Sequence, residues 1–361
     1  MKKRVCFLRE HLKRILISIG CLWLAIGLTV KDAEAGSIRE KIKERQRERM
    51  EEKNSKNTPY PLIEEKCSSY IQSQCEAGDY RRHLEFDGRK RFYDLHIPQG
   101  YNKEKAMPVV LVFHGGGGNP VQQRNDSQMD KVSDAHGFIV VYPAGTGKLE
   151  DKFLTFNSGN GFGYANKNNV DDVGWTKALL DDVETLCHTD KNRVYATGFS
   201  NGAFMCYRLA FELSDRIAAF APVSGVLGVE TSIYKLDRPI SIIHFHGLND
   251  PNVAYHGGIG PKAFEKIPRP SVSETIYFWT NHNGCPKKSI KESWVGKAVC
   301  TIYAPGREGS EVILWTLEDG GHAWPGGKSS LPEKQVGKVN MDISASELIW
   351  QFFEKHPRQE R

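Results

Sequence analysis

The stretch "RVYATGFSNGAFMCYRLAFEL", residues 193–213, decides the fold. Its first seven residues form a short apolar run typical of a buried strand, and the residues from 201 onward are predicted to form a helix. Between them, Gly198, Ser200 and Gly202 fit the pattern G-x-S-x-G. A serine on so tight a strand-to-helix turn adopts a strained backbone that only small neighbours tolerate. We therefore predict that Ser200 is a nucleophile held above the sheet edge, and the alternative is a structural Gly-Ser turn.

Similar apolar runs alternate with helical segments along the rest of the chain. Because strands that are apolar throughout are buried on both faces, this alternation predicts a mostly parallel central sheet of about eight strands with helices on both faces. Two of the eight form a β-hairpin around Asp87-Gly88 within residues 81–98. The other strands are predicted at 108–114, 138–143, 193–199, 217–224, 240–246 and 311–317, and helices at 120–136, 176–188, 201–213, 271–283 and 343–355.

A serine nucleophile needs a histidine base and a carboxylate that fixes the tautomer of that histidine. Of the twelve histidines, His322 lies in a glycine-rich loop that follows the last predicted core strand. Asp250 follows the strand at 240–246, in a turn closed by proline, although an aspartate before proline is also common in ordinary turns. The chain order Ser200, Asp250, His322 is that of the α/β-hydrolase fold. Asp319 is a rival acid, but it lies only three residues before His322 on the same loop.

The stretch "FHGGGGNP", residues 113–120, follows the first core strand, in the loop where α/β-hydrolases place part of the oxyanion hole. We predict that the amides of Gly116 and Asn201 form this hole, with Gly115 as an alternative to Gly116. The glycine run has neither the lysine nor the spacing of a phosphate-binding loop, so no nucleotide cofactor is expected. His244 and His246 alternate on one strand and could form a metal pair, but no third ligand is suitably spaced, and no metal is expected.

The first 35 residues have the form of a signal peptide. A basic start precedes an apolar run at 15–30, and Ala33-Glu34-Ala35 fits a cleavage site. An uncleaved membrane anchor is the alternative, and it would be the chain's only link to a membrane. Residues 36–57 are expected to form a charged helical tether or linker, and residues 58–361 the catalytic domain. The formal charge of +5 comes mainly from the segments before the predicted domain, which excludes a nucleic-acid partner.

Export to the periplasm or the medium permits disulfides. Cys67 and Cys75 are close in sequence, as are Cys285 and Cys300, and we predict these two bridges. Cys187 and Cys206 are expected to be buried thiols.

With these residues in place, the chain resembles the exported esterases of the polyhydroxybutyrate depolymerase and feruloyl esterase group, similar to carbohydrate esterase family one. The resemblance extends over residues 78–357 and depends on the segments "FHGGGGN", "VDDVGW", "RVYATGFSNGAFMCYRLA", "APVSG", "HFHGLNDPNVAYHGG", "NGC" and "EDGGHAWPGG". It implies an α/β-hydrolase with Ser200 as nucleophile, Asp250 as acid, His322 as base and Gly116 and Asn201 as oxyanion donors. It also implies the bridge between Cys285 and Cys300.

The resemblance implies hydrolysis of carboxylic esters, either hydroxyalkanoate oligomers or feruloyl and acetyl esters, without a cofactor. The loop "FNSGNGFGYANKNNVDDVGW" lacks the "WNAG" and the cysteine pair of many family members, and the chain stops at Arg361 without a polymer-binding domain. We therefore expect a soluble or short ester as substrate. Two alternatives are a serine peptidase of the same fold and a non-catalytic binding protein. Substrate contacts are expected from four residues: Trp175, Phe162, Trp324 and His114.

Overall fold

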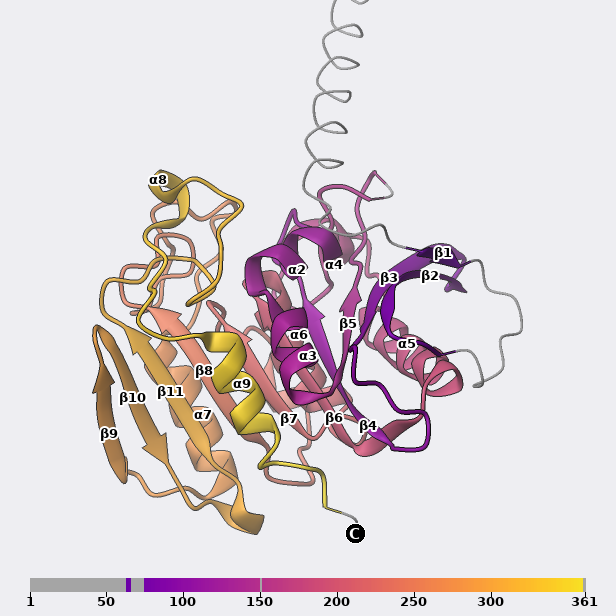
Figure 1. The fold of residues 1–361 in the computed structure, drawn as a ribbon. Helices are drawn as coiled ribbons and strands as arrows, with labels where there is room; N and C mark the ends of the chain where they lie inside the picture. The colour runs from indigo at the N-terminus through magenta and orange to yellow at the C-terminus, as the bar shows by residue number, and fades with distance from the viewer. Residues whose placement is uncertain (1–62, 66–74, 150, 360–361) are drawn as a thin grey trace, which may run out of the picture. The chain divides into compact units, whose positions relative to one another are not determined.

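Six parallel strands form the centre of the sheet (Figure 1). The computed structural model describes residues 63–65, 75–149 and 151–359, so the predicted signal peptide, the tether and Cys67 lie outside the described residues. Four of the central strands are buried along their whole length, which explains their continuous apolar sequences. The six are β4 (Met107–Phe113), β5 (Ile139–Pro143), β6 (Thr189–Phe199), β7 (Ala219–Val223), β8 (Ser241–Gly247) and β11 (Val312–Leu317).

Antiparallel strands extend the sheet at both edges. The predicted hairpin is formed by β2 (Gly78–Phe86) and β3 (Arg89–Ile97), and β3 pairs with β5. The short β1 (Ile63–Glu65) is the exception, because it pairs in parallel with β2. At the other edge, β10 (Ala298–Tyr303) pairs with β11, and β9 (Lys291–Val295) pairs with β10. The described residues thus form eleven strands in the order β1-β2-β3-β5-β4-β6-β7-β8-β11-β10-β9, three more than the eight expected.

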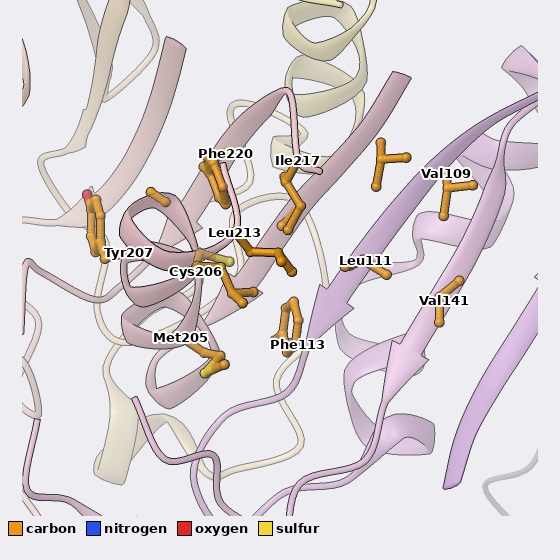
Figure 2. Packing of buried hydrophobic residues seen from close by; sticks show 14 of the residues in the cluster. Val109, Leu111, Phe113, Val141, Met205, Cys206, Tyr207, Leu213, Ile217 and Phe220 are labelled. Carbon is orange, nitrogen blue, oxygen red and sulfur yellow. The ribbon is translucent and has the colours of Figure 1, made fainter. Parts of the chain in front are cut away.

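Helices cover both faces of the sheet, as predicted for an α/β-hydrolase. Side chains that alternate along β4 separate the two layers: Leu111 and Phe113 pack in one apolar cluster with Met205, and Val110 and Val112 pack in the other with Trp350. Figure 2 shows the first cluster between β4 and α6. The first face carries α5 (Asp172–Leu186), α6 (Asn201–Glu212) and α7 (Val272–Asn283), and the second carries α2 (Pro120–Ser127), α3 (Met129–His136) and α9 (Ala345–Phe353).

Two helix boundaries differ from the prediction, and in each case the conformation or the side chain of one residue determines where the helix begins or ends. Residues 120–136 form two helices because Gln128 adopts a left-handed conformation with φ 53°. Helix α5 begins at Asp172, four residues before the predicted start, because the side chain of Asp171 accepts a hydrogen bond from the amide of Gly174. Two short helices lie in the connecting loops, α4 (Gly163–Lys167) and α8 (Glu333–Val336). Within the described residues, none of the helices combines the length and the apolar character that a bilayer span requires.

An ion-pair network joins the hairpin to α2 and α3. The guanidinium of Arg124 contacts the carboxylates of Asp79 and Asp130, and Nδ1 of His96 lies 2.8 Å from Oδ1 of Asp79. Asp79, His96 and Asp130 are close enough together to hold a metal ion. The positive charge at this place is supplied by Arg124, so the cluster is a structural ion-pair network.

A disulfide joins Cys75, just before β2, to Cys187, which caps the C-terminus of α5. The predicted bridge between Cys67 and Cys75 is therefore wrong, and so is the prediction of a free thiol at Cys187. The hairpin packs beside α5, and this contact brings together two cysteines that are 112 residues apart. Cys206 is a buried free thiol, as predicted.

The predicted bridge between Cys285 and Cys300 is also wrong, because both are free thiols. Cys300, on β10, belongs to the apolar cluster of the α9 face, whereas Cys285, after α7, packs against the cluster of the opposite face. The sheet thus separates the two sulfur atoms. Burial raises the pKa of the Cys300 thiol to about 11.

Candidate active site

Ser200 occupies the turn between β6 and α6 in a strained conformation, with φ 53° and ψ −114°. Two glycines make this turn possible. A Cβ atom on Gly198 would lie 2.6 Å from the backbone of Gly202, and one on Gly202 would lie 2.3 Å from the carbonyl oxygen of Phe113. The glycines of G-x-S-x-G are therefore required by the close approach of β4, β6 and α6.

Ser200, His322 and Asp250 form a hydrogen-bonded chain. Nε2 of His322 lies 2.9 Å from Oγ of Ser200, and Nδ1 of His322 lies 2.7 Å from Oδ2 of Asp250. The other carboxylate oxygen of Asp250 accepts the amides of Asn252 and Val253, both at 2.8 Å. Since an ionised carboxylate only accepts hydrogen bonds, Nδ1 of His322 carries the proton and Nε2 is left to accept from the serine hydroxyl. This arrangement can transfer the serine proton to the imidazole.

The loops that carry Asp250 and His322 pack directly on each other. Asp250 follows β8 and His322 follows β11, and these parallel neighbours end at the same edge of the sheet. A Cβ on Gly247 would lie 2.3 Å from the carbonyl oxygen of Gly320, so this position has no room for any side chain. The rival Asp319 pairs instead with Nζ of Lys338 at 2.6 Å.

A buried chain of hydrogen bonds lies behind Asp250. Nε2 of His246 donates to the carbonyl of Val253 at 2.8 Å and lies 3.4 Å from Oδ2 of Asp250. Nδ1 of His246 therefore accepts from Nε2 of His244 at 3.2 Å, and Nδ1 of His244 accepts from the hydroxyl of Tyr207 at 2.7 Å. Burial lowers the pKa of both histidines, so both rings are neutral. All their nitrogens are used in this chain, which positions the acid and leaves no lone pair for a metal.

The glycines after β4 make room for aromatic rings and a tight turn. A Cβ on Gly115 would lie 2.9 Å from the ring of Phe199, and one on Gly116 would lie 2.4 Å from the ring of Phe162. Gly117 has φ +80°, and the amide of Gly118 donates to the carbonyl of Gly115 at 3.0 Å, which closes a β-turn.

His114 fixes the orientation of the peptide between Gly115 and Gly116. The amide of Gly145 donates to Nε2 of His114 at 3.0 Å, so Nδ1 carries the proton and donates to the carbonyl of Gly115 at 2.7 Å. In a trans peptide the N–H of Gly116 points away from that carbonyl. Neither this N–H nor that of Asn201 has a hydrogen-bond partner within the described residues, and both residues line the cavity beside Ser200.

The cavity beside Ser200 has a volume of about 510 Å³. Its wall contains Gly116, Ser200, Asn201 and His322, so the predicted nucleophile, the predicted base and the predicted oxyanion donors meet at one place, while Asp250 lies behind His322. Apolar side chains from β6, α6 and the loops complete it, namely Phe162, Phe199, Phe204, Val253 and Ile267.

Comparison with known proteins shows the family to which the chain belongs. Residues 91–239 match the family described as esterase PHB depolymerase. A protein of Aspergillus flavus named "probable feruloyl esterase C" is 30% identical over 232 residues, which are 64% of this chain and 76% of that protein. The chain belongs to the polyhydroxybutyrate depolymerase and feruloyl esterase group. It is a carboxylic ester hydrolase, as the sequence predicted.

Two further proteins are similar to this esterase, one in sequence and one in its solved structure. The bifunctional acetylxylan esterase/xylanase XynS20E of Neocallimastix patriciarum is 31% identical over 164 residues, which are 45% of this chain and 22% of that protein. The solved structure of native pOPH shares the fold, with a TM-score of 0.51 and 14% identity over 79% of this chain and 89% of that one.

Of the four side chains expected to contact substrate, the structure places two at the cavity of the esterase. Phe162 lines it directly, whereas both ring nitrogens of His114 are bonded to the backbone. Trp175 is buried in the core against Arg91, and the indole N–H of Trp324 donates to Oγ of Ser346 in the opposite layer. The two tryptophans therefore pack in the interior and do not line the cavity.

The sequence analysis missed the charged side chains of the cavity wall, among them Arg269. It lies in an irregular segment, residues 251–270, without apolar periodicity. The only feature of the sequence that marks Arg269 is the proline on each side of it, because two prolines restrict the backbone around this residue.

Proposed function

We propose that this esterase acts through an acyl-enzyme on Ser200. The observation that carries the proposal is the hydrogen-bonded chain from Ser200 through His322 to Asp250. His322 takes the proton of the serine hydroxyl while Oγ attacks the ester carbonyl, and it then donates that proton to the departing alcohol. Water, deprotonated by the same imidazole, releases the acid and restores the serine. Asp250 holds the ring in the required tautomer and stabilises the imidazolium.

The oxyanion of the tetrahedral intermediate is stabilised by the N–H groups of Gly116 and Asn201. Two features support this assignment: both groups lack protein partners within the described residues, and His114 fixes the peptide of Gly116. Asn201 is also the first residue of α6, where the helix dipole favours negative charge. Its side chain bonds the backbone of Phe156 and so holds the helix start in position.

The proposed substrate is a short or soluble carboxylic ester, either a hydroxyalkanoate oligomer or a feruloyl or acetyl ester. The mainly apolar cavity of about 510 Å³ fits a small acyl group, and the names of the matched relatives include feruloyl and acetylxylan esterases.

The proposed location is the periplasm or the medium, after removal of residues 1–35, with residues 36–57 as a tether and residues 58–361 as the catalytic domain. The disulfide between Cys75 and Cys187 supports an oxidising compartment. Sequencing the N-terminus of the exported protein tests this proposal. A chain that starts at Gly36 is expected, and a membrane-bound chain that retains Met1 would contradict it.

The activity test compares wild type with Ser200→Ala on p-nitrophenyl esters from acetate to octanoate, methyl ferulate and hydroxybutyrate oligomers. Loss of the nucleophile should lower kcat by about 10⁶-fold. Ser232→Ala, at an exposed serine, is the matched control and should retain wild-type rates. Equal rates in wild type and Ser200→Ala would refute the mechanism, and the substrate profile of wild type identifies the acyl group.

A further inference from the structure

Arg269 lies in the wall of the cavity that also contains Ser200. Its guanidinium carbon is 5.0 Å from the ring centroid of Phe204, and the amide of Phe204 donates to the carbonyl of Ser200 at 3.0 Å. Nη1 of Arg269 donates to the carbonyl of Asn160 at 2.6 Å. The contact with Asn160 joins the guanidinium to the loop at 156–175, where this sequence departs from the family it resembles, and the contact with Phe204 joins it to α6.

Arg269 has no carboxylate partner within the described residues. Other arginines of the domain that are removed from water form ion pairs, such as Arg82 with Asp182 at 2.9 Å and Arg91 with Asp172 at 2.7 Å. Burial lowers the pKa of the Arg269 guanidinium, and the charge of Glu265 opposes this shift only in part. Glu265 pairs with Lys167 at 2.7 Å instead. A partly desolvated cation is thus left with one carbonyl and one aromatic ring as its partners.

The other charged groups of the cavity wall do not neutralise Arg269. Lys262 and Lys334 add two cations, and neither forms an ion pair among the residues described. The second acid of the wall is Asp126, whose carboxylate accepts the hydroxyl of Ser330 at 2.7 Å. Burial raises the pKa of Asp126 to about 6, which weakens its negative charge in mildly acidic solution. The cavity therefore carries an excess of positive charge.

We propose that Arg269 binds a carboxylate of the substrate, so that the enzyme prefers esters that also carry a free carboxylate. Nη1 is occupied by Asn160, and the edge formed by Nε and Nη2 has the geometry for a bidentate bond to a carboxylate. This inference rests on the proposed function and identifies the substrate class of that site. The carboxylate has two chemical sources, the free end of a hydroxyalkanoate oligomer or an acidic sugar in an acylated oligosaccharide.

The test measures kcat/KM for matched pairs of charged and neutral substrates. The first pair is a hydroxybutyrate trimer as free acid and as methyl ester, and the second is an acetylated xylo-oligosaccharide with and without a glucuronic acid branch. Wild type should prefer the charged member of one pair, and that pair identifies the source. A charge-assisted hydrogen bond contributes about 1.5–3 kcal/mol, so Arg269→Gln should reduce the preference about 10- to 100-fold.

Lys266→Gln is the matched control, because Lys266 is exposed on the same segment and does not line the cavity. It should retain the wild-type preference, and Arg269→Lys should retain only part of it because an ammonium cannot bind in bidentate fashion. The proposal is overturned if wild type hydrolyses both members of both pairs equally well, or if Arg269→Gln leaves the preference unchanged. Hydrolysis of p-nitrophenyl acetate by wild type separates this failure from failure of the proposed esterase mechanism.

Discussion

His114 makes the stability of the fold depend on pH in a way that a single substitution should reveal. The ring is 1% exposed, and burial lowers its pKa from 6.5 to about 4. The folded state therefore keeps His114 neutral in a range where the unfolded chain binds a proton. The contribution of neutral His114 to the free energy of unfolding is fully present above pH 6.5. It is lost as the pH falls from 6.5 towards 4, because the unfolded chain then binds a proton that the folded chain does not bind. At pH 4.5 the loss amounts to about 2–3 kcal/mol, since each pKa unit corresponds to about 1.4 kcal/mol.

The assay is urea denaturation of wild type and His114→Gln at pH 7.5 and pH 4.5. Glutamine can accept from the amide of Gly145 and donate to the carbonyl of Gly115, but it does not titrate. Between pH 7.5 and pH 4.5, the free energy of unfolding of wild type should fall by about 2–3 kcal/mol more than that of His114→Gln. The buried His244 and His246 titrate in both proteins and cancel in the comparison, and His256→Gln, at an exposed histidine, should behave as wild type does. Parallel pH dependence in wild type and His114→Gln would refute the reasoning.

Three further substitutions test the site and the fold. Asp250→Asn should lower kcat about 10⁴-fold while leaving the secondary structure by circular dichroism unchanged, and near-normal activity would exclude Asp250 as the acid. Gly116→Ala places a Cβ 2.4 Å from the ring of Phe162, and overpacking of about 1–3 kcal/mol should lower kcat/KM about 10- to 100-fold; unchanged kinetics would show that the loop relaxes freely. Replacing both Cys75 and Cys187 by serine should lower the free energy of unfolding by about 4–5 kcal/mol, because the bridge closes a loop of 112 residues, and an unchanged denaturation midpoint would argue against this bridge.

The elements that the sequence predicted correctly have local signals. β4, β6 and α6 combine continuous apolar strands with a glycine-bounded turn, and the same signals led to the prediction, which remains to be tested, that Ser200 is the nucleophile and Gly116 and Asn201 are oxyanion donors. β9 was missed because its side chains are mostly exposed and give no apolar run. The break between α2 and α3 was missed because Gln128 is not a residue that marks a left-handed conformation.

The cysteine pairing and the lining of the cavity could not be predicted, because both depend on which elements, far apart in the sequence, pack together in the fold. Proximity in sequence favoured two bridges that do not form, because the pairing is set by which elements pack together across the sheet. Trp175 and Trp324 are in suitable positions along the chain for substrate contact, but Trp175 lies on the buried face of α5 and Trp324 is buried in a loop whose contacts include α9. The role proposed for Arg269 depends on the lining of the cavity, which leaves a half-buried guanidinium without a carboxylate partner among the described residues.

Covalent labelling of the nucleophile tests the central claim most directly. The esterase is treated with a fluorophosphonate, and peptide mapping by mass spectrometry locates the adduct while residual hydrolysis of p-nitrophenyl acetate is measured. The account predicts one adduct, on Ser200, that forms in step with the loss of activity and is absent from Ser200→Ala. An adduct on another residue that abolishes activity, or full activity with Ser200 labelled, would contradict it.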